Sequence, residues 1–273
     1  MACEVKVIAD SINPYNGIRL TTFQLKYWRS IHSELMTHRV FSRNASSSRA
    51  IPVAKMIEQV RFEPSGPIHW GKNQPGMKAR EELDQPQKIS VQSLWLEAAN
   101  SAADIAEKMM NEGVHKQVAN RILEPFQYIS VIVTATDWDN WFELRDHHDA
   151  QPEIQELAIA MHNAMNESKS RVTFYHLPYI TDKEQYDHDV VECMQMSAAR
   201  CARVSYLTHD GKAPSIEKDL KLYNDLVGSV PLHASPTEHQ AMAKTSKDYI
   251  KNFRGWKQHR VDVEATINNL KQK

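Results

Sequence analysis

The strongest constraint on the fold is the segment 126–136 (FQYISVIVTAT), which has no charged residue and is rich in β-branched side chains. Such a run is typical of a strand that is buried on both faces of a sheet. Residues 88–112 are rich in Ala, Leu, Glu and Lys and are followed by Gly113, a pattern that predicts a long amphipathic helix. A buried central strand combined with long helices predicts an α/β protein.

Alternating and helical patterns extend this interpretation along the chain. Residues 5–11 and 20–27, joined by turn residues at 13–17, predict a pair of strands, and a short helix should then end near 37–39. Further helices are predicted at 114–123, around Arg145 with Asp137 as N-cap, and at 152–167, 187–204 and 215–227, with a short strand at 175–180. No internal repeat or linker is visible in the sequence, so we expect one domain over residues 1–273.

Three polar segments are predicted to be loops. Residues 41–52 (FSRNASSSRAIP) are dense in Ser and Asn, whose side chains compete with helical hydrogen bonding. Residues 64–77 (PSGPIHWGKNQPGM) combine Pro and Gly with aromatic and basic residues. Loops of this length inside a compact domain are usually functional or disordered, and we expect this one to be functional. Residues 229–240 form the third predicted loop.

Charge and hydropathy exclude several classes of protein. Lys and Arg number 33 against 34 Asp and Glu, so the formal net charge of −1 does not favour binding to nucleic acid or to an anionic membrane. The sequence contains no apolar run of 18 residues, and residues 1–10 lack the basic start and apolar centre of a secretion signal. We therefore expect a cytoplasmic protein that binds no membrane and no nucleic acid.

Cysteine and histidine spacing does not predict a metal site. Cys3, Cys193 and Cys201 are widely spaced and form no CxxC pair, so we interpret them as reduced packing residues. The 13 histidines include no HExxH motif. If His147 and His148 lay within a helix, they would point to different faces. Hydrogen-bonded or solvated histidines, and no metal, are the expectation.

A basic cluster lies within the first predicted loop. Three arginines, one histidine and several serines occur between His38 and Arg49. Guanidinium groups match phosphate oxygens, and serine hydroxyls can complete such a site. The composition alone favours a solvated basic loop over such a phosphate site.

The spacing within this cluster resembles the hallmark of the flavin-dependent thymidylate synthases, the thymidylate-synthase-complementing family. That hallmark reads Arg-His-Arg, seven residues, then Ser, with Asn before the Ser and Arg two residues after it. Here Arg39 is followed by seven residues and Ser47, with Asn44 before it and Arg49 after it. Two further blocks are similar to the family: Asn140 to Arg145 followed by AQPEIQ, and AARCARVS followed by HASPTEH at 233–239.

The order of these blocks differs from the family. The third block precedes the Arg-His-Arg block in the family, whereas here it follows, so the chain resembles a circularly permuted relative. The three blocks lie within residues 20–52, 121–155 and 197–240 and together cover roughly half of the chain. The resemblance implies a single α/β (α+β) domain with a mainly antiparallel sheet and several long helices.

The resemblance also implies a reaction. The family is a homotetramer that binds FAD and moves a one-carbon unit from methylenetetrahydrofolate to C5 of dUMP, giving dTMP. Reduced flavin supplies the hydride, and NADPH reduces the flavin. Because a cofactor performs this chemistry, the protein needs cations and a donor for the pyrimidine carbonyl rather than a nucleophile. None of the three cysteines has the proline neighbour of the cysteine-dependent thymidylate synthases.

Residue roles follow from the resemblance, position by position. His38, Arg39 and Asn140 would contact FAD, with His233 and Glu238 along the flavin and Ser205 near its phosphates. Ser47 and Arg49 would hold the phosphate of the nucleotide, and Arg145 would face and polarise the pyrimidine. The expected site residues are therefore Arg145, Ser47 and His233 for catalysis; His38, Arg39, Asn140, Ser205, His233 and Glu238 for the cofactor; and Ser47, Arg49, Arg43, Glu34, Arg121 and Arg145 for the substrate.

Departures from the family pattern concern the substrate. Thr37 stands where the first Arg of the hallmark belongs, Glu34 where the family usually has Gln, and Ala45 and Ala50 where it usually has an acid or amide and a Tyr. Losing one arginine beside a phosphate removes a charge-assisted contact worth roughly 1.5–3 kcal/mol. Either another basic residue such as Arg43 compensates, or the substrate differs. A carboxylate at position 34 accepts hydrogen bonds where an amide can also donate.

Three functions therefore stay open. The first is thymidylate formation. The second is a related flavin-dependent modification of a pyrimidine nucleotide, such as hydroxymethylation. The third is a catalytically silent protein that binds nucleotides with the same fold.

Overall fold

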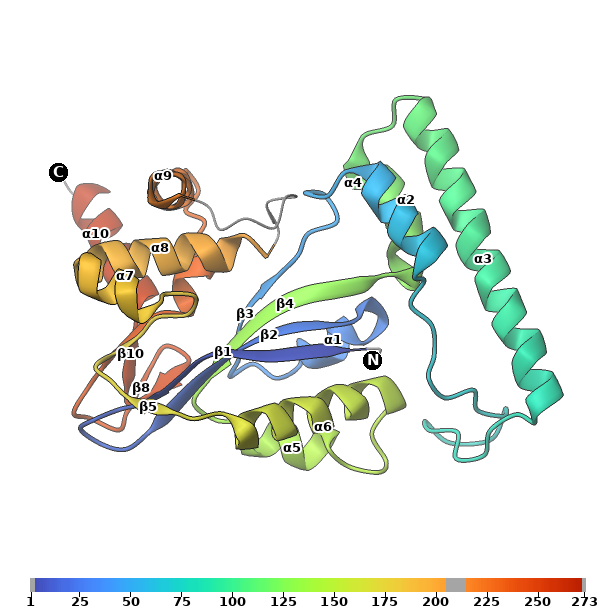
Figure 1. The fold of residues 1–273 in the computed structure, drawn as a ribbon, viewed down its shortest axis with the longest axis horizontal. Helices are drawn as coiled ribbons and strands as arrows, with labels where there is room; N and C mark the ends of the chain where they lie inside the picture. The colour runs from blue at the N-terminus through green and yellow to red at the C-terminus, as the bar shows by residue number, and fades with distance from the viewer. Residues whose placement is uncertain (1–2, 205–214, 272–273) are drawn as a thin grey trace.

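The computed structural model describes residues 3–204 and 215–271 and centres on a five-stranded sheet in the order β3-β4-β2-β1-β5 (Figure 1). Neighbouring strands are antiparallel except for the parallel pair β1 and β5. The strands of this sheet are β1 (Glu4–Ile12), β2 (Arg19–Trp28), β3 (Ser42–Ala45), β4 (Tyr128–Ala135) and β5 (Arg171–Val172). The mainly antiparallel α/β architecture expected from the sequence is thereby confirmed.

Helices surround the sheet in three groups (Figure 1). α5 and α6 cover one face, α2 to α4 stand at one end, and α7 to α10 gather at the other end. The α-helices are α1 (His32–Leu35), α2 (Val53–Phe62), α3 (Gln85–Asn111), α4 (Lys116–Ala119), α5 (Asp139–Arg145), α6 (Pro152–Glu167), α7 (Asp182–Asp187), α8 (Val190–Ala202), α9 (Ile216–Val227) and α10 (His259–Lys271). Within residues 3–204 and 215–271, the 3₁₀ turns are η1 (Arg29–Ile31), η2 (Asn120–Phe126) and η3 (Ser235–Glu238).

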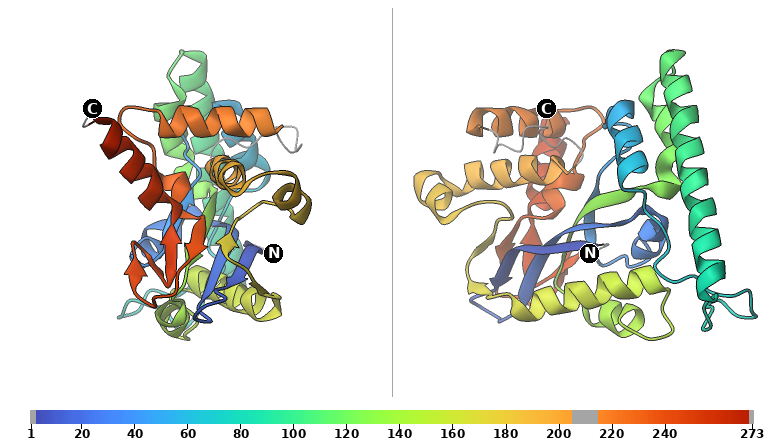
Figure 2. Two further views of the ribbon diagram at one scale, coloured as in Figure 1. Left: turned by 90° about the vertical axis from the view of Figure 1, so that its left-hand side faces the viewer. Right: turned by 45° about the vertical axis from the view of Figure 1, so that its right-hand side comes forward.

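The main core lies between the central sheet and α5 and α6. It is built from buried side chains that include Phe23, Trp138, Trp141, Ile154 and Leu157. A second apolar cluster joins α2 to α3, where Ala99, Ala103 and Ala106 repeat at helical spacing and let the two helices approach closely. α3 stands upright at the edge of the molecule in the right-hand view of Figure 2.

The predicted strands agree with the structure except at the serine-rich segment. The hairpin β1–β2 and the buried strand β4 are confirmed. The prediction of a loop over the whole of 41–52 is wrong, because Ser42–Ala45 pairs with β4 as an edge strand. The open edge of β4 supplies backbone partners to a sequence whose own β-propensity is low. The rest of the segment, and residues 64–77, are irregular as expected.

Most helix predictions are confirmed, with local corrections. α3 begins three residues earlier than predicted, because Asp84 and Gln87 form a capping box. Asp137 is not the N-cap of α5, since it accepts a hydrogen bond from Thr136 and pairs with Arg254. Residues 114–123 are only one α-helical turn continued by the 3₁₀ turn η2. α7 precedes α8 and was not expected.

The C-terminal part adds a second sheet, of which the sequence predicted one strand, at 175–180; the structure confines that strand to residues 175–176. Its strands are β6 (Tyr175–His176), β7 (Ala241–Ala243) and β10 (Trp256–Gln258), with the small hairpin β8 (Tyr249–Ile250) and β9 (Phe253–Arg254) beside it. The buried Asn13, in the turn between β1 and β2, donates from Nδ2 to the Gly255 carbonyl at 2.7 Å and to the Lys244 carbonyl at 3.0 Å. The first turn of the chain is therefore fastened to its last strands.

Cysteines and several histidines are structural. Cys3, Cys193 and Cys201 are buried free thiols, as expected. His176 and His239 are fully buried and join Thr22 and Thr134 in a chain of hydrogen bonds, and burial lowers both histidine pKa values to about 3. In the described part of the chain, no helix has both the length and the apolar character needed to cross a membrane.

Candidate active site

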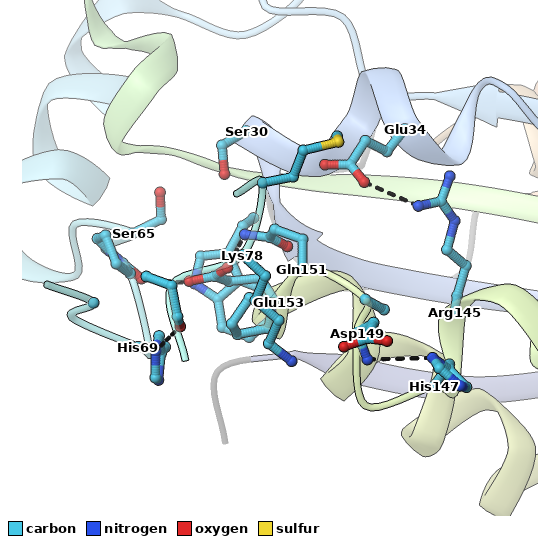
Figure 3. A pocket seen from close by; sticks show the side chains of 18 of the residues that line it. Ser30, Glu34, Ser65, His69, Lys78, Arg145, His147, Asp149, Gln151 and Glu153 are labelled. Carbon is cyan, nitrogen blue, oxygen red and sulfur yellow. Dashed lines mark hydrogen bonds and ion pairs between the residues drawn. The ribbon is translucent and has the colours of Figure 1, made fainter. Parts of the chain in front are cut away.

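A pocket of about 660 Å³ opens where α1, α5, the start of α6 and the predicted functional loop meet (Figure 3). Glu34 and Arg145 form one side of it, and Gln151 and Glu153 lie near the start of α6. The loop from Ser65 to Ala79 supplies the opposite wall. Two predicted site residues thus share a pocket with the loop that was expected to have a function.

Arg145, in the last turn of α5, is the centre of the polar contacts. Its Nη1 lies 3.1 Å from Glu34 Oε2, and its Nε donates to His38 Nε2 at 3.2 Å. Its Nη2 lies 3.5 Å from Thr37 Oγ1. The side chain is 21% exposed and Glu34 is 37% exposed, so the ion pair remains open to the pocket. The guanidinium is therefore oriented before any ligand arrives.

His38 helps to hold the Arg145 guanidinium in this orientation. It is buried, stacks on Phe41 and meets the Trp141 ring edge-on at 4.8 Å. Burial, reinforced by the positive charges of Arg145 and Arg43, lowers the pKa of His38. The histidine is therefore neutral at pH 7, and its Nε2 can accept the hydrogen bond from Arg145.

Glu153 fixes the loop wall of the pocket. This buried carboxylate accepts a hydrogen bond from the backbone N–H of Ile68 at 2.8 Å and another from Gln151. Sequence reasoning did not single out Glu153, although the AQPEIQ run contained it. Trp28 and Trp95 add aromatic surface to the same pocket.

The predicted phosphate residues Ser47 and Arg49 lie outside this pocket. Arg49 is exposed, and the Ser47 hydroxyl accepts a hydrogen bond from the backbone N–H of Arg49 at 3.3 Å. Their loop is nevertheless held firmly, because Asn120 Nδ2 donates to the Ser48 carbonyl at 2.6 Å and Ser48 donates to Glu124 at 2.8 Å.

Glu124 also pairs with two arginines, including the predicted Arg121. Arg29 approaches it at 2.9 Å and Arg121 at 3.1 Å, with the Arg121 side chain 58% exposed. Arg43, another predicted substrate residue, donates instead to the backbone carbonyls of Met36 and His38. The two hydrogen bonds donated by Arg43 hold the turn around His38 in place.

The third sequence block packs against the first, although about 190 residues separate them. Ser235 Oγ donates to Asn44 Oδ1 at 3.2 Å, and Asn44 in turn donates to the Cys201 carbonyl at 3.0 Å. Glu238 forms an ion pair with Arg260, and the His233 side chain is exposed. Ser205 lies outside the described residues.

Arg39 and Asn140 flank the contact between His38 and Trp141. Both are exposed, and neither side chain forms a hydrogen bond or ion pair with another residue that the structure describes. A free guanidinium suits phosphate oxygens, and a free amide can donate to and accept from a polar ring edge.

Comparison with protein families matches residues 20–168, more than half of the chain, to the thymidylate synthase complementing proteins. The chain belongs to this family. The match includes the first two sequence blocks and ends before the third. Arg145 and the two side chains that contact it, Glu34 and His38, all lie within the matched residues.

Solved structures similar to this member of the thymidylate synthase complementing family include a UMP/dUMP methylase, PolB, from Streptomyces cacaoi. The structure bound with 5-Br UMP has 16% identity and a TM-score of 0.48, covering 59% of this chain and 88% of that chain. The structure bound with 5-Br dUMP has 18% identity and a TM-score of 0.43, covering 55% and 69%. No curated protein sequence matches the chain.

One histidine prediction is corrected beside the pocket of this family member. The sequence predicted that, within a helix, the two rings would lie on different faces. His147 and His148 instead lie beyond the end of α5, and their ring centroids are 4.2 Å apart. With Asp149 they place three potential metal ligands within 4.8 Å of one another. Lys78 and Arg80 contact the same residues, and their positive charges oppose a divalent cation there.

Proposed function

We propose that the chain transfers a one-carbon unit to C5 of a pyrimidine nucleotide in a flavin-dependent reaction. The family resemblance supplies the form of this reaction, in which methylenetetrahydrofolate provides the carbon and dUMP becomes dTMP. The observation that supports it most directly is that Glu34 and Arg145 line one pocket while the buried His38 contacts Arg145 from behind. The two ends of the Glu34–Arg145 pair are 111 residues apart in sequence, so only the folded chain creates this site.

Arg145 has the central role in the proposed chemistry. Its guanidinium, oriented by Glu34 and neutral His38, would donate to a pyrimidine carbonyl and stabilise negative charge that develops on the ring. The loop held by Glu153 would limit the access of water to the bound base.

The residues around His38 fit FAD by their chemistry. Exposed Arg39 offers a cation for a diphosphate, and exposed Asn140 offers an amide for the edge of a flavin ring. When bound, FAD would supply the hydride, and NADPH would be its reductant. Following the family pattern, His233, Glu238 and Ser205 would complete the cofactor site.

Ser47 and Arg49 are proposed to bind the nucleotide phosphate, but in the pocket of a neighbouring copy. Their loop is rigidly fastened while Arg49 remains exposed and away from the pocket of its own chain. A homotetramer, which the family resemblance implies, would bring such a loop to a second pocket. We also propose one domain over residues 1–273, because Asn13 joins the first hairpin to the C-terminal strands.

A related pyrimidine modification is the second candidate function. Thr37 and Glu34, two departures from the family pattern, both contact Arg145. Because they alter the surroundings of the residue proposed to face the base, the nucleotide or its product can differ from those of the family.

Two measurements on one purified preparation distinguish the proposed enzyme from a catalytically silent protein that only binds nucleotides. The purified protein should absorb as a flavoprotein and lose that absorbance when reduced nicotinamide is added. With methylenetetrahydrofolate it should release tritium from C5-labelled dUMP or dCMP, whereas the Arg145→Ala protein should not. A colourless protein, or a flavin-loaded protein that releases tritium from neither nucleotide, would contradict the proposed function.

A further inference from the structure

The surroundings of Arg145 differ from a simple anion site. Three side chains, Glu34, Thr37 and His38, contact its three guanidinium nitrogens at 3.1, 3.5 and 3.2 Å. Only one of these three, Glu34, carries a negative charge, and it lines the pocket together with Arg145 (Figure 3). The pocket therefore presents a paired acceptor and donor rather than an isolated positive charge.

Glu34 restricts which hydrogen bonds this pair can form. An amide at position 34 could present either its N–H₂ or its oxygen to a ligand, whereas a carboxylate only accepts. Glu34 Oε2 is engaged by Arg145, and the side chain is 37% exposed, so the carboxylate can still receive a donor from a ligand. A ligand group beside Glu34 must therefore carry an N–H or O–H.

Thr37 makes this arrangement possible. Its neutral hydroxyl donates to the Glu34 carbonyl and lies beside the Arg145 guanidinium. An arginine at position 37 would place a second positive charge there and compete with Arg145 for the Glu34 carboxylate. The residues at positions 34 and 37 thus act together on the same guanidinium.

Pyrimidine bases differ at the edge that such a pair would meet. Uracil has one ring N–H between two carbonyl oxygens, so a carboxylate that reaches the N–H lies against a carbonyl. Cytosine has an exocyclic amine at C4 next to the N3 and O2 acceptors. Carboxylates are suited to accept from that amine, while arginine donates to the neighbouring acceptor.

We propose that Glu34, seated beside Arg145, makes the pocket select a nucleotide whose pyrimidine carries an amino group at C4 over the corresponding uracil nucleotide. This inference rests on the proposed function, since it assumes that the base binds beside Arg145. It assigns to Glu34 the choice of base and to Arg145 the polarisation of the ring.

A purely structural role for the pair would not explain its position. Partly exposed ion pairs contribute little to stability, commonly below about 1 kcal/mol. The described chain also has partly exposed ion pairs whose residues do not line the pocket, such as Arg61 with Glu107. A role in ligand selection predicts an effect on the ratio of two affinities, which a structural role would leave unchanged.

The test is calorimetric titration of dCMP and of dUMP into the purified flavin-loaded protein. The wild type should bind dCMP about tenfold more tightly than dUMP. Glu34→Gln should remove or reverse this preference, because the amide can donate to the uracil carbonyl. Glu143→Gln, on the exposed face of α5, is the matched control and should keep the wild-type ratio.

The outcomes separate the inference from the proposed function. If dUMP binds as tightly as dCMP or more tightly, or if Glu34→Gln leaves the ratio unchanged, the inference is overturned. Tritium release from C5-labelled dUMP would then still support the proposed function. If neither nucleotide binds the flavin-loaded protein, both are overturned.

Discussion

The pocket around Arg145 and the loop of Ser47 and Arg49 come from two different blocks of the family pattern and are built in opposite ways. In the pocket, functional side chains contact one another and are fixed by direct hydrogen bonds. In the loop, Asn120 fixes the backbone at Ser48, and the Arg49 side chain is exposed. The first region is preorganised within one chain, whereas the second fits our proposal that Arg49 serves the pocket of a neighbouring copy.

The largest expected effect is at Arg145. Arg145→Ala should lower the rate of tritium release by about 100-fold or more, because the oriented donor to the pyrimidine is lost. Arg61→Ala, which removes an arginine with surface ion pairs on α2, should leave the rate near that of the wild type. Similar rates for both variants would contradict the central role of Arg145.

Substitution of Arg49 should affect nucleotide binding more than FAD content. Arg49→Ala should weaken nucleotide binding about 10- to 100-fold, as expected for a lost charge-assisted hydrogen bond, with FAD content unchanged. Calorimetry of the flavin-loaded variant measures the nucleotide affinity, and the flavin absorbance of the variant measures its FAD content. An unchanged affinity would mean that Arg49 is an ordinary exposed side chain.

Mixing the two variants tests whether the regions come from different copies. If Arg49 serves a neighbouring pocket, co-refolded Arg145→Ala and Arg49→Ala chains should recover roughly a quarter of wild-type activity by random assembly. The separate variants, each refolded alone, are the controls. If the mixture is no more active than the better variant, the loop acts within its own chain.

Acidic pH should weaken nucleotide binding through the pocket around Arg145 and should not change the contribution of Arg49. The pKa of His38 is lowered in the folded protein, so its contribution to stability is present above the unfolded pKa near 6.5 and is lost as pH falls through the folded value. Protonation also turns its Nε2 into a donor facing Arg145, so nucleotide affinity should fall by up to about tenfold per pH unit. His38→Gln should flatten this profile, whereas Arg49→Ala should retain it.

The smallest effect is expected at the loop wall of the pocket. Glu153→Gln weakens the acceptor for the Ile68 N–H, so hydrogen exchange of that amide should accelerate while nucleotide affinity changes by less than about tenfold. Glu167→Gln, exposed at the end of the same helix, is the control. Unchanged exchange at Ile68 would show that the loop is held by other contacts.

Patterns in the sequence predicted the elements whose stability is local. β4 is uncharged and β-branched, and α6 begins with Pro152 after the capping side chain of Gln151. β3 and the strands β7 to β10 were missed because they are two to four residues long and exist only through their partners. Short strands of this kind carry too little periodicity to recognise.

The candidate site was also predicted only in part. Family spacing predicted Glu34, His38 and Arg145, and the structure brings them together. It does not bring Ser47, Arg49 or His233 to that pocket, and their roles stay predictions. Glu124 and Glu153 were missed, since a carboxylate that fastens a distant loop has no local pattern.

The clamp of Asn13 on Lys244 and Gly255 has a consequence for synthesis on the ribosome. The hairpin that contains Asn13 emerges well before the carbonyls that receive its amide, which lie 231 and 242 residues further along the chain. Until then the amide must remain hydrated, and the strand face near Thr22 lacks the partners that His176 and His239 provide. Long-range pairing of this kind delays folding, so the nascent hairpin must stay soluble while most of the chain is translated.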